Sequence, residues 1–123
     1  MEKWSYVMFI EKSKNYNRLN KSEITKHVDN LIKLDNSGIL ELCGVFKGYP
    51  GVAGMIILNT QNYEEAEEIC KAEPLVSGGY ATYKLVALQI ATKDNNYLLW
   101  KNIKTEYVKI SVFLSLRCHF DNL

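Results

Sequence analysis

Four short stretches of the chain are predicted to form β-strands, and in the first two the side chains separate onto two faces with a period of two. They span residues 3–11, 39–47, 52–58 and 80–91. The first stretch is apolar on both faces, because Val7 and Phe9 stand between the apolar side chains of the other face. We therefore expect this strand to lie in the middle of a sheet. Tyr49-Pro50-Gly51 has turn chemistry, so the second and third strands are predicted to pair as an antiparallel hairpin.

Residues 20–38 have the spacing of one complete helix. Asn20 is placed to cap its start and Glu23 to complete a capping box. Apolar side chains then recur every three or four residues, at Ile24, Val28, Leu31 and Leu34, and Gly38 follows as a residue suited to the left-handed conformation that ends a helix. His27 lies three residues after Ile24 and four before Leu31, so it is expected to point towards the core.

A second helix is predicted over residues 60–71. Asn62 is its expected cap, with Glu65 completing the box. The proline at position 74 disfavours helical backbone at Glu73, so we expect Glu73 to be extended. Successive glutamates point in different directions around a helix, so the acidic residues of this segment are interpreted as a solvated face rather than a metal site.

The predicted order is strand, helix, strand, strand, helix, strand. This is the order of a ferredoxin-like α+β sandwich, with both helices on one face of an antiparallel sheet. Beyond it, residues 97–104 are predicted as a short helical turn, and alternation over residues 108–120 predicts an extra C-terminal strand. We therefore divide the chain into a ferredoxin-like domain, 1–91, and an extension, 92–123, that packs on the same domain or on a partner subunit.

Composition narrows the classes of protein that fit. A net charge of +1 over 123 residues gives no footprint for nucleic acid or for an acidic membrane surface. The first residues do not resemble a signal peptide, and no apolar run is long enough to span a bilayer. The three cysteines match no metal-ligand spacing, which favours a reduced, cytoplasmic protein.

Motifs for nucleotide binding, zinc hydrolysis and a serine nucleophile elbow are missing from the sequence. Three cations, Lys12, Lys14 and Arg18, gather in the loop after the first strand. They suit an anionic substrate, although a solvated loop explains them more simply.

An ordered set of residues over about 4–91 resembles the YCII-related domain family. It comprises His27-x-x-x-Leu31-x-x-Leu34-x-x-x-Gly38, Gly44-x-Phe46, Gly54-Met55, Glu65-Ala66 and Glu73-Pro74-x-Val76-x-x-Gly79. Family members usually have an aspartate before the proline, whereas this chain has Glu73. The tail from Thr92 onward has no counterpart in the family pattern.

The resemblance implies a dimeric α+β barrel, in which the sheets of two subunits pack face to face. It also implies a small enzyme of lyase or isomerase type that needs no cofactor or metal. Its substrate is expected to be a small organic molecule, either a ring compound or a halogenated one. On this view His27 is the general acid–base and Glu73 orients it and stabilises its cation.

Other interpretations stay open. A buried histidine satisfied by its neighbours explains His27 without catalysis. Tyr6, Met8, Tyr80 and Tyr83 suit the lining of a substrate pocket, and core packing explains them equally well. The whole chain also fits a non-catalytic domain that binds a small ligand, or an assembly module joined through its tail.

Overall fold

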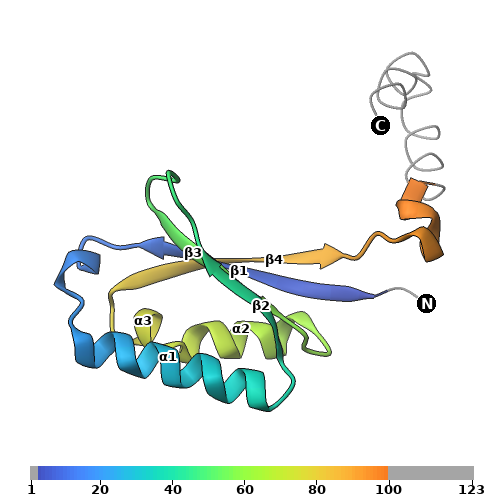
Figure 1. Cartoon of the computed structure of the whole chain (residues 1–123). Coiled ribbons are helices and arrows are strands. Elements are labelled where there is room, and N and C mark those ends of the chain that lie inside the picture. The colour runs from blue at the N-terminus through green and yellow to red at the C-terminus, as the bar shows by residue number, and fades with distance from the viewer. Residues whose placement is uncertain (1–2, 100–123) are drawn as a thin grey trace. The chain divides into compact units, whose positions relative to one another are not determined.

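The computed structural model describes residues 3–99, of which Lys3–Gln89 forms one compact unit (Figure 1). Four strands of this unit make one sheet: β1 (Trp4–Lys12), β2 (Leu40–Val45), β3 (Val52–Leu58) and β4 (Ala81–Gln89). Its helices are the 3₁₀ turn η1 (Tyr16–Arg18), α1 (Lys21–Asn36), α2 (Tyr63–Ala72) and the short α3 (Pro74–Ser77). The four predicted strands and two predicted helices are all present, with ends that differ by up to three residues.

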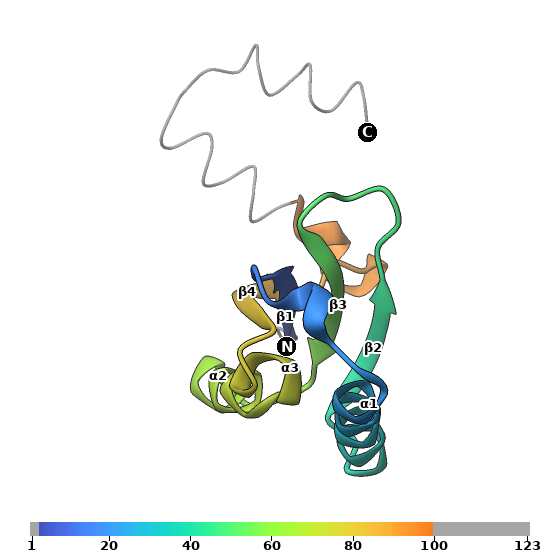
Figure 2. The same cartoon turned by 90° about the vertical axis from the view of Figure 1, so that its left-hand side faces the viewer.

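The strands lie in the order β2-β3-β1-β4, and every neighbouring pair is antiparallel. Met8 of β1 stands between Ile56 of β3 and Leu85 of β4, which places β1 in the interior of the sheet as its apolar faces predicted. The helices α1, α2 and α3 lie on the same side of the sheet (Figure 2). The fold is therefore the predicted ferredoxin-like α+β sandwich.

Alternation along the strands separates a covered face of the sheet from an open one. Met8, Ile56 and Leu58 point towards the helices and are almost completely buried. The opposite face carries apolar side chains as well, and several of them stay accessible: Leu42 is 56% exposed, Val86 40% and Leu88 44%. No helix of Lys3–Gln89 covers this second face (Figure 2).

The buried stripe of α1 differs from the predicted one. Ile24 is 47% exposed and Val28 43%, so the expectation that both face the core is wrong. The inner face is instead centred on His27, with Leu31 half-buried and Leu34 buried. Compared with the predicted orientation, α1 is rotated about its axis, and His27 lies in the middle of the face that contacts the rest of the protein. Its predicted cap is confirmed, since Asn20 Oδ1 accepts from Glu23 N at 2.9 Å.

The second helix is capped as predicted, because Asn62 Oδ1 accepts from Glu65 N at 2.9 Å. Glu65 Oε1 reaches back one residue further than a capping box requires and accepts from Gln61 N at 3.2 Å. The sequence did not predict α3, which begins directly after Glu73 with Pro74 in its first turn. Proline is favoured there because its missing N–H needs no helical partner.

Residues 90–99 belong to a second unit. Its 3₁₀ segment η2 runs from Lys93 to Leu98, beginning four residues before the helical turn predicted over 97–104. Thr92 starts η2 with a complete capping box, in which Asn95 Oδ1 accepts from Thr92 N at 2.9 Å. Most of that turn and the strand predicted over 108–120 lie outside the described residues, so the 92–123 extension stays a prediction.

Candidate active site

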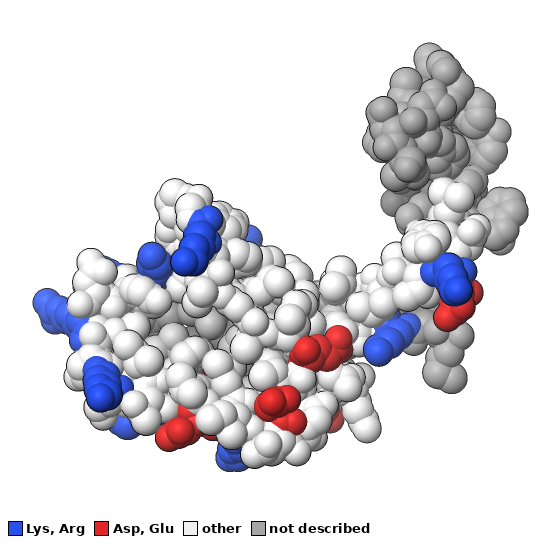
Figure 3. Space-filling model, viewed as in Figure 1, with Lys and Arg blue, Asp and Glu red and all other residues white. Residues whose placement is uncertain are grey.

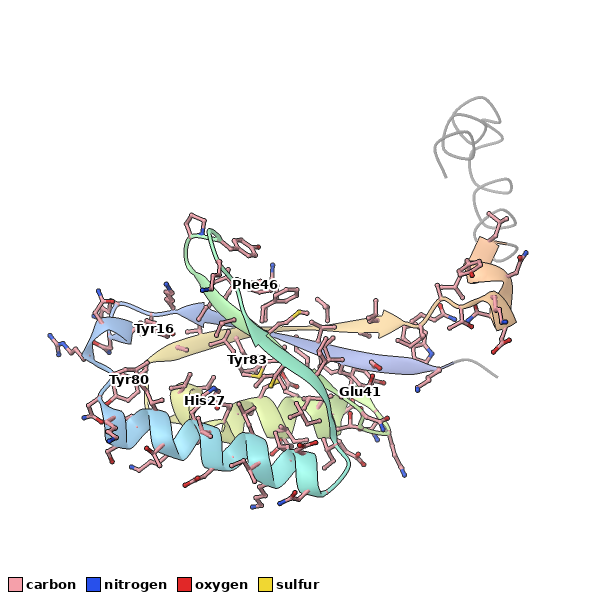
Figure 4. All side chains as sticks on the ribbon, viewed as in Figure 1. Tyr16, His27, Glu41, Phe46, Tyr80 and Tyr83 are labelled. Atoms are coloured by element: carbon pink, nitrogen blue, oxygen red, sulfur yellow. The ribbon has the colours of Figure 1, made fainter. Side chains whose placement is uncertain are left out.

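His27 and Glu73 contact each other across the interior of the Lys3–Gln89 unit. They are separated by 46 residues in the sequence, yet His27 Nδ1 meets Glu73 Oε1 directly. The histidine comes from the face of α1 that looks towards the sheet (Figure 4). Its side chain keeps 19% of its surface exposed, whereas Glu73 has none exposed. The two residues that the sequence singled out are therefore brought together, with only the histidine open to solvent.

Local backbone structure fixes the position of Glu73. Its backbone is extended, with φ −62° and ψ 128°, as the following proline predicted. Its second carboxylate oxygen, Oε2, accepts from Leu75 N at 2.6 Å and so caps α3. Both oxygens of this buried carboxylate thus have polar partners, which offsets the cost of removing it from water.

This contact determines which nitrogen of His27 is available for chemistry. A carboxylate oxygen at Nδ1 is an acceptor, so Nδ1 carries the hydrogen that it donates. Within residues 3–99, Nε2 has no hydrogen-bond partner. The arrangement leaves Nε2 free to accept a proton, and a carboxylate beside an imidazole can stabilise its cation.

Besides His27 and Glu73, a further polar residue belongs to this region, and sequence reasoning did not single it out. Asn30 lies three residues after His27, so the two side chains are neighbours on the helix surface. Its Nδ2 is buried and has no hydrogen-bond partner among the described residues. A buried amide without a partner is uncommon, and it can donate to an oxygen of a bound molecule. A lone Asn on an amphipathic helix gives no signal of this in the sequence.

A buried thiol lies close to Glu73, and a tyrosine lies close to that thiol. Cys70 is fully buried. Burial raises the pKa of its thiol to about 12, and the charges of Glu67 and Glu73 act in the same direction. Such a thiol stays protonated at neutral pH, so Cys70 is a packing residue rather than a nucleophile. Burial also raises the pKa of Tyr83, whose hydroxyl donates to Glu67 Oε2 at 3.2 Å.

The residues predicted to line a substrate pocket have different surroundings. Met8 has no exposed surface, and Tyr6 is 8% exposed with its ring edge-on to that of Tyr63 at 6.2 Å. Both belong to the hydrophobic core. Tyr80 is half-buried, and Figure 4 places it on the same side of the sheet as His27. Binding of substrate by Tyr6, Met8 and Tyr80 stays a prediction.

Residues 3–99 contain neither a cluster of metal ligands nor a membrane-spanning helix. Nowhere in this range do three or more His, Cys, Asp or Glu side chains cluster in a way that could hold a metal ion. On the acidic helix α2, Glu68 is 77% exposed and pairs with Lys71 at 3.8 Å. Within the same range, no helix combines the length and apolar character needed to cross a membrane.

Comparison with known proteins supports the fold. The chain matches no protein-family model, and no curated protein sequence matches it. Among solved structures, it is similar to 5-chloro-2-hydroxyhydroquinone dehydrochlorinase from Burkholderia phenoliruptrix AC1100 in complex with 2,5-dihydroxybenzoquinone. The similarity has a TM-score of 0.52 at 11% sequence identity, and covers 75% of this chain and 99% of the other. At this identity the comparison establishes a shared fold.

Proposed function

We propose that this chain is a YCII-like enzyme of lyase or isomerase type, in which His27 moves a proton on a small organic substrate and Glu73 orients it. The observation that carries the proposal is the contact between His27 Nδ1 and a fully buried carboxylate. A histidine held in this way presents Nε2 as a base of fixed direction. The fold shared with a dehydrochlorinase is consistent with a ring compound or halogenated molecule as substrate.

The pair can carry out an elimination without further groups. Nε2 of His27 removes a proton from a saturated ring carbon, and the electron pair left behind forms a new double bond to the neighbouring carbon. A halide leaves from the neighbouring carbon with the electrons of its own bond, so charge and atoms balance. Glu73 stabilises the imidazolium until the imidazolium releases its proton to solvent. In an isomerisation, the same proton returns to a different carbon of the substrate.

Asn30 is a candidate substrate-binding residue in this scheme. Its unpartnered Nδ2 lies one helical turn from His27, where it can donate to a substrate oxygen while the proton moves. A buried donor without a partner gains a full hydrogen bond when a ligand oxygen arrives.

We propose further that two copies associate through the open face of the sheet. Val7, Phe9 and Ile57 share this face with the exposed Leu42, Val86 and Leu88. An apolar surface of this kind on a sheet is typical of an interface. The resulting arrangement is the face-to-face packing of a dimeric α+β barrel.

A non-catalytic binding or accessory domain is the second candidate. The cap that Glu73 provides to α3 favours this second candidate, because capping alone would account for a glutamate at this position. On this interpretation the ion pair joins α1 to α3, and the chain binds its ligand without turnover.

The experiment that separates the two is a turnover assay on chlorinated hydroxyquinols and small ring acids, with halide release and absorbance as readouts. Under the catalytic proposal, His27→Gln lowers turnover by about 10²–10⁴-fold with the circular dichroism spectrum unchanged. Asp29→Asn, an exposed change two residues away on α1, is the matched control and keeps full activity. Equal turnover in His27→Gln and wild type contradicts the proposal.

A further inference from the structure

A cavity of about 420 Å³, wide open to solvent, lies beside the turn between β2 and β3. This volume is within the range of pockets that bind small molecules. Lys12, Tyr16, Phe46 and Tyr49 are among the residues that line it, and neither His27 nor Glu73 is. The cavity is therefore distinct from the candidate active site.

Aromatic rings form part of its wall. The ring of Phe46 lies 5.3 Å from that of Tyr49, measured between centroids, with the planes tilted by 57°. Phe46 also stacks on Phe9, with 6.3 Å between the ring centroids and the planes only 20° apart. Contact with two neighbouring rings restricts the movement of Phe46. Aromatic rings that are fixed in place can stack on a flat, unsaturated ligand.

The charged group of the cavity is the ammonium of Lys12. Its Nζ lies 5.2 Å from the centre of the Tyr16 ring, in a cation–π contact that positions the charge without neutralising it. Among residues 3–99 no carboxylate lies within ion-pairing distance of Lys12. The ammonium is thus free to meet an anion.

Further cations surround this end of the unit. Lys14 and Arg18 follow Lys12 along the chain, Lys47 lies in the turn beside the cavity, and none of these three forms an ion pair within the described part of the chain. On the face seen in Figure 3, blue side chains lie around the hairpin and at the end that carries η1, where no red ones are seen, while both colours lie along the helices. Such an uneven distribution of charge attracts anions towards the cavity.

We infer that this cavity binds a small aromatic anion, a carboxylate or a phenolate, with its ring against Phe46 and Tyr49 and its charged oxygen at Lys12 Nζ. The inference is independent of the proposed catalysis, because it uses none of the same residues. It gives a role to the cations that the sequence placed in the first loop.

The test is a titration of the full-length protein, followed by ¹H–¹⁵N NMR, with three probes of similar shape. Benzoate is the aromatic carboxylate, 2,4-dinitrophenolate the phenolate, and benzamide the neutral equivalent of benzoate. We expect saturable shifts at residues 46–53 with one or both anions, and binding at least about tenfold weaker with benzamide. Whichever anion binds identifies the preferred acid group.

Variants establish which residues bind the probe. Lys12→Met is expected to weaken anion binding at least about tenfold, and Lys12→Arg to retain it. Lys33→Met removes an exposed cation of α1 and serves as the matched control, with unchanged binding. Tyr49→Ala is expected to weaken benzoate binding while leaving the signals of the sheet core in place.

Three results would each overturn the inference. The first is binding of benzamide as tight as that of the anions, and the second is equal affinity in Lys12→Met and wild type. The third is a set of shifts centred on His27 rather than on residues 46–53. In contrast, His27→Gln is expected to leave anion affinity unchanged, so failure of the catalytic proposal and failure of this inference give different results.

Discussion

Glu73 connects His27 on α1 to the backbone of α3, using one carboxylate oxygen for each. The histidine is therefore oriented by a residue whose own position is fixed by the first turn of a neighbouring helix. An imidazole held in this way would need no rearrangement to act as the proposed base. The same contact makes the pair part of the fold as well as of the candidate site.

Glu73→Ala should lower the stability of the protein. The change removes a helix cap, leaves His27 without its partner and opens a small hole in a fully buried position. We expect the free energy of unfolding to fall by about 2–4 kcal/mol, measured by urea denaturation. Glu68→Ala, at a 77% exposed side chain, should change it by less than about 0.5 kcal/mol. Similar small effects from both changes would contradict the role of Glu73 in the fold.

The neutral form of His27 should carry its hydrogen on Nδ1. The reason is that Glu73 Oε1 accepts from this nitrogen. Ring ¹⁵N chemical shifts report the tautomer directly, and His119→Gln leaves His27 as the single histidine of the chain. Glu73→Gln is expected to shift the population towards the other tautomer. A signal for hydrogen on Nε2 in the unmutated pair would be inconsistent with the proposed base.

Cys70 should resist thiol reagents at neutral pH, because burial raises its pKa to about 12. In a Cys118→Ser background, iodoacetamide should modify the exposed Cys43 and leave Cys70 unmodified until the protein unfolds. Mass spectrometry of the labelled peptides distinguishes the two sites. Equal labelling of Cys70 in the folded protein would contradict its burial.

The same thiol predicts a loss of stability in alkali. The unfolded chain releases the Cys70 proton near pH 8.5–9, whereas the folded chain holds it to about pH 12. Between these values the folded state binds more protons, so its stability falls as pH rises, by up to about 1.4 kcal/mol per pH unit. Cys70→Ala should flatten this part of the stability curve, and an unchanged slope would count against the raised pKa.

Association through the open sheet face can be tested by placing charge on it. Val86→Glu should reduce the proposed dimer to monomers, because a carboxylate would be buried at the interface without a partner. Ile32→Glu is the control, since Ile32 is 52% exposed on α1, outside the sheet. Light scattering coupled to size exclusion gives the masses. A dimer that persists in Val86→Glu places the interface elsewhere.

Much of the fold could be predicted because short apolar stretches bounded by turn residues indicate strands, and β1 and β3, which each lie between two other strands, are apolar on both faces. The rotation of α1 could not. Periodicity identified an apolar arc on this helix, but Ile24 and Val28 lie at its edge, and the polar His27 lies at its centre. The helix α3 has only four residues, so it is too short for helical periodicity to be recognised in the sequence.

The candidate site could be predicted in part, because two of its residues have local signals in the sequence. His27 and Glu73 each have a local signal, the inner position on a helix and the residue before a proline. Their contact depends on tertiary structure, and only the family resemblance paired them beforehand. The cavity beside the β2–β3 turn draws Lys12, Tyr16 and Phe46 from separate elements, so no local pattern could indicate it.

The wide separation of His27 and Glu73 along the chain has a practical consequence. A cut in the turn at Tyr49-Pro50 would leave the histidine on one fragment and the carboxylate on the other. Fragment 1–49 would also carry β1 and β2, and the remainder β3 and β4, so neither half could complete the sheet alone. Activity recovered on mixing the two pieces would then report their reassembly, which makes this protein a candidate for a split reporter.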